Sequence, residues 1–134
     1  MMVLAHIDSD SIRVELMKNR TEGGMLLARQ QAIQQMQAVG IKQKRQVLDN
    51  KTSMAYRQEI TATGMMYQLV PPDDHRKIIA KKTVRTWKEH FIAVCSGVST
   101  NFSIHLWCRL IPQAEKQLLL QRKSNVNPKL SAFA

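Results

Sequence analysis

The stretch that decides the fold is residues 68–95, QLVPPDDHRKIIAKKTVRTWKEHFIAVC. Its apolar opening stops at Pro71 and Pro72, because proline cannot donate the backbone hydrogen bond that a strand or helix interior needs. Apolar side chains then recur at spacings of three and four, which is the period of one helix face. We therefore expect a short strand over 65–70 and a long helix over 75–95. The side chains expected to be buried on that helix are Ala80, Val84, Trp87, Phe91 and Val94.

The opposite face of this helix is cationic. Four basic residues recur at i, i+4, i+8 and i+11, so their charged groups emerge along one side of the helix. They are Lys77, Lys81, Arg85 and Lys88. Such a stripe favours a polyanionic partner, and the alternative is an ordinary solvated basic face. His75, at the start of the helix, either touches a phosphate or is a plain N-terminal helix residue. The candidate phosphate-contacting residues are His75, Arg76, Lys77, Lys81, Lys82, Arg85 and Lys88.

The positive charge is concentrated in the C-terminal half of the 134-residue chain. Residues 75–134 carry eleven Lys or Arg against two acids, whereas residues 1–74 carry nine against eight, so the second half holds +9 of the net +10. A field of one sign attracts phosphate backbones, whose binding weakens steeply as salt rises. Charge therefore favours nucleic acid as partner without implying that a sequence is read.

Length and composition predict a globular protein with one domain over 1–134, because 44% of the residues are hydrophobic and the chain has no low-complexity tract. No run approaches the roughly 20 apolar residues of a membrane span. We expect an intracellular protein of the nucleus or cytoplasm, with no membrane partner. Cys95 and Cys108 lack metal-ligand spacing and are expected to be buried thiols.

Upstream of the deciding stretch, strand and helix patterns alternate. Thr21 is a helix-capping residue type, and Gly40 suits the left-handed position that closes a helix. The next strand ends at Asp49, and carboxyl ends of strands are where ligands and catalytic groups collect in α/β sheets. The expected elements are strands at 2–7, 11–17 and 47–49 and helices at 22–39 and 52–62.

Downstream, a break over 97–101 precedes a last helix that begins at Asn101 or Ser103 and runs through Leu119. Pro112 either kinks this helix or starts a new one. The order of elements predicts an α/β or α+β fold, with a small mixed sheet flanked by helices and parts at 1–70 and 75–134.

Four blocks carry a family resemblance: IRVELMKNRTEGGM at 12–25, VLDN at 47–50, QLVPPDDHRKIIAKKTVRTWKEHFIAV at 68–94 and HLWCRLIPQAEKQLLLQRKSNVNPKLSAFA at 105–134. Together they resemble the integrase core (catalytic) domain of copia-type retrotransposon polyproteins, which is related to retroviral integrases. The resemblance implies a ribonuclease-H-like α/β fold, here lacking its first strand, with DNA as partner and homo-oligomers that assemble on DNA ends.

The resemblance also implies a catalytic site. In the family, two aspartates and a glutamate hold Mg²⁺ ions for DNA end processing and strand transfer. Asp49 matches the second aspartate, and Lys81, 32 positions later, stands where the glutamate belongs. The strand with the first aspartate is expected to be missing, since Asp8 and Asp10 come too late in the order. A lysine repels Mg²⁺, so we expect DNA binding without catalysis.

Asp73 or Asp74 could replace the missing glutamate as a metal ligand. The alternative is that the two acids favour the N-terminal end of the helix that follows them. A different class of function is a noncatalytic module, derived from an integrase, for a nucleic-acid or protein partner. A third interpretation is a genomic relic without a stable fold, because loss of a strand exposes backbone hydrogen-bonding groups.

Overall fold

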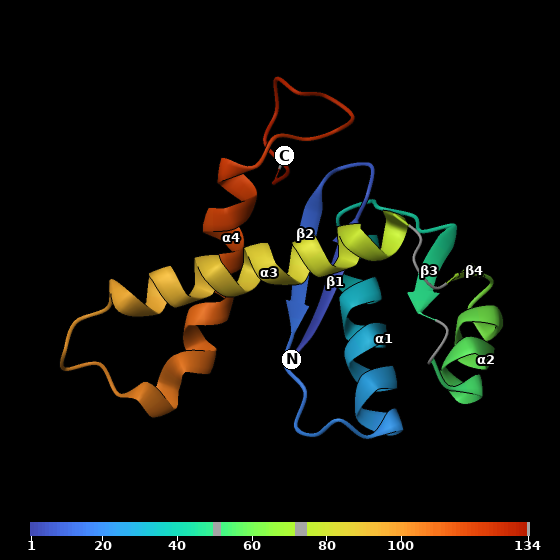
Figure 1. Cartoon of the computed structure of the whole chain (residues 1–134), viewed down its shortest axis with the longest axis horizontal. Helices are drawn as coiled ribbons and strands as arrows, with labels where there is room; N and C mark the ends of the chain where they lie inside the picture. Colours follow the sequence, from blue (N-terminus) through green and yellow to red (C-terminus); the bar gives the residue numbers. More distant parts are fainter. Residues whose placement is uncertain (50–51, 72–74, 134) are drawn as a thin grey trace. The chain divides into compact units, whose positions relative to one another are not determined.

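The computed structural model describes residues 1–49, 52–71 and 75–133, and for 75–79 it describes the backbone alone. The chain forms two compact units, which we call unit 1 (residues 1–2 and 15–79) and unit 2 (residues 3–14 and 80–134). The elements in chain order are β1 (Met2–His6), β2 (Ser11–Glu15), α1 (Glu22–Ala38), β3 (Arg45–Asp49), α2 (Met54–Ala62), β4 (Met66–Val70), α3 (His75–Ser96), the 3₁₀ helix η1 (Ile104–Leu110) and α4 (Ile111–Gln121) (Figure 1).

The mixed α/β class is confirmed, but the single small mixed sheet is wrong for the part of the chain that the structure describes. The strands form two separate two-stranded sheets, β1–β2 and β3–β4. Each sheet packs its apolar side chains into a different core, one in each unit. Two cores therefore replace the one expected.

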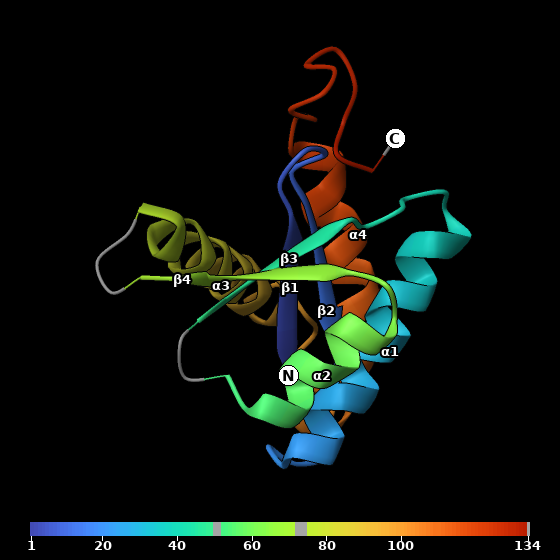
Figure 2. The same cartoon turned by 90° about the vertical axis from the view of Figure 1, so that its right-hand side faces the viewer.

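Unit 1 contains a β–α–β arrangement, in which α2 connects the two parallel strands β3 and β4 (Figure 2). A helical crossover is the usual way to join parallel neighbours, because the chain must return to the start of the sheet. In register, Leu48 lies opposite Leu69, and Asp49 at the end of β3 lies opposite Val70. The core of this unit is built from Leu48, Tyr56, Ile60 and Met65.

Local signals set the ends of the helices in unit 1. The Thr21 hydroxyl accepts a hydrogen bond from the Gly24 N–H, and the Ser53 hydroxyl accepts one from the Tyr56 N–H (both 3.3 Å). Both caps satisfy an N–H that the helix itself leaves unpaired. Gly40, with φ 85°, follows α1 in the left-handed region that favours glycine. The predicted start and stop of α1 are confirmed.

Unit 2 contains the β1–β2 hairpin, the described side chains of α3, η1 and α4. Trp87 of α3 packs against Ile12 and Val14 of β2 and against the apolar face of α4. Glu115 of α4 fixes the hairpin, because its carboxylate accepts hydrogen bonds from Arg13 Nη1 at 2.7 Å and from the Val14 backbone N–H at 2.9 Å. Residues that are about a hundred positions apart in the chain thus share one small core.

The buried face of α3 differs from the prediction. Ala80 and Val84 are exposed, Val84 by 49%, and Thr83 is buried instead. The reason is geometric: Thr83 and Trp87 lie one helical turn apart on the side that meets the core, and Val84 lies about 100° further round the helix. Trp87, Phe91 and Val94 pack into the core as predicted.

The C-terminal segment consists of two helices. A 3₁₀ helix is followed by α4, and Pro112 occupies the first turn of α4, where its missing N–H costs nothing. Of the two alternatives for Pro112, a new start is therefore confirmed. Ser103 precedes the 3₁₀ helix as its N-cap residue, without a side-chain hydrogen bond to the helix.

Candidate nucleic-acid interface

The basic stripe of α3 is exposed in the region where side chains are described. Lys81, Arg85 and Lys88 lie within a 60° arc of the helix surface, because successive residues are rotated by about 100°. They span roughly 10 Å along the axis at 1.5 Å per residue. Lys82 is also exposed and lies beside this arc. These four cations present a continuous positive surface on one side of the helix.

One of the four cations, Arg85, forms an ion pair within the helix. Arg85 Nε lies 2.7 Å from Glu89 Oε1, one turn further along the helix, and both side chains are largely exposed. The hydrogen bond to Glu89, with the attraction of its charge, raises the pKa of Arg85. Lys81, Lys82 and Lys88 take part in no ion pair with another residue that the structure describes. These three, the "free lysines" of α3, are the best placed to meet phosphates.

Apolar side chains flank the stripe. Val84 and Ile92 are both about half exposed; Val84 lies about 70° round the helix from the centre of the arc, and Ile92 lies in line with the arc one turn beyond Lys88. A phosphate backbone makes no use of such groups, whereas a protein partner would cover them. The surface is thus basic and partly apolar at once.

The N-terminal part of the predicted interface is described only as backbone. His75, Arg76 and Lys77 form the first turn of α3, and their side chains lie outside the described residues. Asp73 and Asp74, considered as replacement metal ligands, also lie outside them. The phosphate contacts of His75, Arg76 and Lys77 and the metal-binding role of Asp73 or Asp74 therefore stay predictions.

Asp49 is the last residue of β3, as predicted, and its side chain is exposed. Its backbone oxygen accepts hydrogen bonds from the N–H (3.1 Å) and the hydroxyl (2.7 Å) of Thr52. The described residues contain no group of three His, Cys, Asp or Glu side chains that could hold a metal ion. One described carboxylate does not fit a pair of Mg²⁺ ions, which need clustered anionic oxygens.

Two of the histidines, His6 and His90, have structural contacts. A ring nitrogen of His90 donates to the Ala114 carbonyl at 3.0 Å, and His6 Nδ1 accepts from the Ser9 N–H at 3.3 Å within the β1–β2 turn. Neither arrangement leaves the ring aimed at a ligand. Cys95 and Cys108 are free thiols, but both are half-buried, so the expectation of buried thiols is wrong in degree.

Sequence reasoning missed a buried cation in unit 1. The Arg29 side chain is 0% exposed, and its Nε donates to Gln46 Oε1 at 2.9 Å. Its guanidinium carbon also lies 5.9 Å from the centre of the Tyr56 ring. Burial lowers the pKa of Arg29 and raises the pKa of Tyr56, because the low-dielectric core disfavours both charged forms. The available signal was an arginine within the apolar spacing of α1, between Ala28 and Ala32.

A comparison with known protein families and a search of curated proteins find no match to this chain. No helix among the described residues combines the length and the apolar character that crossing a bilayer requires.

Proposed function

We propose that the chain is an integrase-core derivative that binds duplex DNA through α3 and does not catalyse strand transfer. The observation that carries the binding part is the set of free lysines, three exposed ammonium groups on neighbouring positions of one helix surface. Each ammonium that contacts a phosphate releases condensed counterions, which drives binding at low salt without reading the bases.

The catalytic part of the proposal comes from the resemblance together with charge. Lys81 stands at the family's glutamate position, and it belongs to the same exposed set of cations. An ammonium group attracts the phosphate and repels the metal, so the residue that ends catalysis also adds a DNA contact. The family resemblance also implies that copies of the chain assemble as homo-oligomers on DNA.

A noncatalytic interaction module is the second candidate, because Val84 and Ile92 expose apolar surface beside the stripe. RNA or an acidic protein with apolar side chains would then replace duplex DNA as the natural partner.

Two assays test the proposal. In a gel shift at 50 and 200 mM salt, labelled duplex DNA should bind, and duplex DNA should compete better than RNA of equal length. With Mg²⁺ and model DNA ends, neither the unaltered chain nor Lys81→Glu should join strands. Stronger competition by RNA would favour the interaction module, and joining by the unaltered chain would refute the catalytic part.

A further inference from the structure

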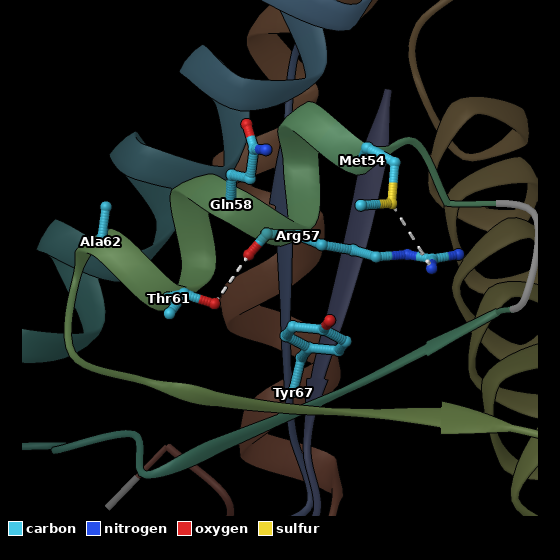
Figure 3. Close-up of a pocket in the computed structure, with 6 residues that line it drawn as sticks. All are labelled: Met54, Arg57, Gln58, Thr61, Ala62 and Tyr67. Atoms are coloured by element: carbon cyan, nitrogen blue, oxygen red, sulfur yellow. Dashed lines mark hydrogen bonds between the residues drawn. The ribbon is translucent and has the colours of Figure 1, made fainter.

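A hollow of about 280 Å³ lies in unit 1, between α2 and β4 (Figure 3). All of its lining comes from these two elements, so its shape belongs to unit 1 alone. The lining residues are Met54, Arg57, Gln58, Thr61, Ala62 and Tyr67.

The lining follows directly from the sequence of α2. Five of the residues recur at i, i+3, i+4, i+7 and i+8, which is one complete face of a helix. The opposite face carries Tyr56 and Ile60 into the core. Tyr67 is the second residue of β4 and remains 39% exposed beside the helix. The unit therefore presents an aromatic ring and a helix face that its own core does not cover.

The chemistry of the hollow combines an aromatic ring, a guanidinium and a thioether. In Figure 3 the Tyr67 side chain extends from β4 toward α2, and the Arg57 side chain extends along the hollow toward Met54. Arg57 Nη1 lies 3.9 Å from the Met54 sulfur, so the guanidinium lies beside the thioether. A flat ring system is complementary to this lining, because it can stack on the Tyr67 ring beside the Met54 thioether.

We propose that this hollow binds one unpaired base of single-stranded DNA, with the base against the Tyr67 ring. Aromatic side chains in positively charged surroundings are the usual platform for unpaired bases, since every base has a π-face. The volume is at the lower limit of small-ligand pockets, so it takes a fragment of the size of one base.

The charge of unit 1 fits this ligand. Residues 1–2 and 15–79 contain ten Lys or Arg against six acids. Three of these cations, Lys42, Lys44 and Arg45, are exposed just before and at the start of β3. They attract a phosphate backbone toward the unit without competing for the base.

This inference extends the proposed function, because it adds base contacts in unit 1 to the duplex contacts of α3. Its test uses the full chain and fluorescence anisotropy with three labelled probes: a blunt 20-base-pair duplex, the same duplex with four unpaired thymines, and an isolated oligothymidine of eight nucleotides. The unpaired tail should strengthen binding about fivefold or more, the gain typical of stacking one base.

Three variants locate the gain. Tyr67→Leu should abolish the effect of the tail while blunt-duplex binding stays unchanged, and Tyr67→Phe should preserve it, because the ring face remains. Trp107→Leu is the matched control in unit 2, since Trp107 is 38% exposed, and it should leave the gain intact. Thermal melting by circular dichroism checks that each variant is folded.

The outcomes separate the two proposals. If neither the tail nor the isolated oligothymidine shows binding that depends on Tyr67, the base site is refuted while duplex binding by α3 stands. If the duplex fails to bind but oligothymidine binds in a Tyr67-dependent way, the base site stands and the proposed function of α3 fails.

Discussion

Replacing Glu89 with glutamine should strengthen DNA binding, because Glu89 forms an ion pair with Arg85, one of the four cations of the α3 surface. In the structure, Arg85 Nε lies 2.7 Å from the Glu89 carboxylate, and this ion pair competes with any phosphate. The variant removes one negative charge and releases the guanidinium, so one further phosphate contact becomes available.

The magnitude follows from counterion release. One added contact makes the slope of log K against log[salt] more negative by about 0.9. If the variant and the unaltered chain bind duplex DNA equally at about 1 M salt, Glu89→Gln binds it about 15-fold more tightly than the unaltered chain at 50 mM salt and about 4-fold more tightly at 200 mM. The stability of the fold should hardly change, because both partners are exposed and exposed pairs contribute little.

Anisotropy titrations of a labelled duplex between 50 and 400 mM salt measure this slope. Glu22→Gln, an equal change of charge in the first turn of α1, is the control and should shift the slope by much less. In the Arg85→Ala background, Glu89→Gln should give no steeper slope, since the freed cation is gone. An unchanged slope in the single variant, or the same gain in the Arg85→Ala background, would refute this reasoning.

Three further predictions concern stability, each measured by urea unfolding. Gly23→Ala should stabilise the protein by about 0.5–1 kcal/mol, because a Cβ at this helical position meets nothing within 4 Å. Gly24→Ala should destabilise the protein by about 1 kcal/mol, because its Cβ would lie 2.6 Å from Asn19 Oδ1. Equal effects of the two substitutions would contradict this local geometry. Glu115→Ala should cost about 2–3 kcal/mol, because the Val14 N–H and Arg13 lose their acceptor, and Glu115→Gln should cost about half as much; a neutral alanine variant would contradict the clamp. Because burial raises the pKa of Tyr56, the folded state keeps its proton longer than the unfolded state, so stability should fall as pH rises above about 10, and Tyr56→Phe should remove that part of the decline.

Local signals in the sequence predicted local structure well. Thr21 and Gly40 bound α1, and the residues before Pro71 form a strand, because capping and proline geometry depend only on near neighbours. The types of the four strands and of α1, α2 and α3 follow from the same periodicities, with ends shifted by at most two residues, whereas the last predicted helix is a 3₁₀ helix followed by α4.

Features that depend on distant pairing could not be predicted in this way. The clamp of Glu115 on β2 joins segments about a hundred residues apart, and the division into two sheets depends on which strands pair. The exposure of Val84 depends on which of two apolar sides of α3 meets the core. The hollow beside Tyr67 requires α2 and β4 to be placed together, which no spacing along the chain reveals.

The candidate site divides in the same way. Exposure of Lys81, Lys82, Arg85 and Lys88 could be predicted, since charge on one face of an amphipathic helix points to solvent. The ion pair with Glu89 was readable from its i, i+4 spacing but was not foreseen. The carboxylate site depended on the family resemblance, and among described residues it contributes Asp49 alone.

The most direct measurement compares the salt slopes of two triple variants on the same blunt duplex. Lys81→Ala, Lys82→Ala and Lys88→Ala together remove the free lysines, while Lys116→Ala, Lys123→Ala and Lys129→Ala remove the same charge from exposed positions elsewhere in unit 2. The slope should become less negative by about 2.7 in the first variant, the sum of three phosphate contacts, and by less than about 1 in the second. Equal slopes for the two variants would show that net charge, and not the surface of α3, holds the DNA.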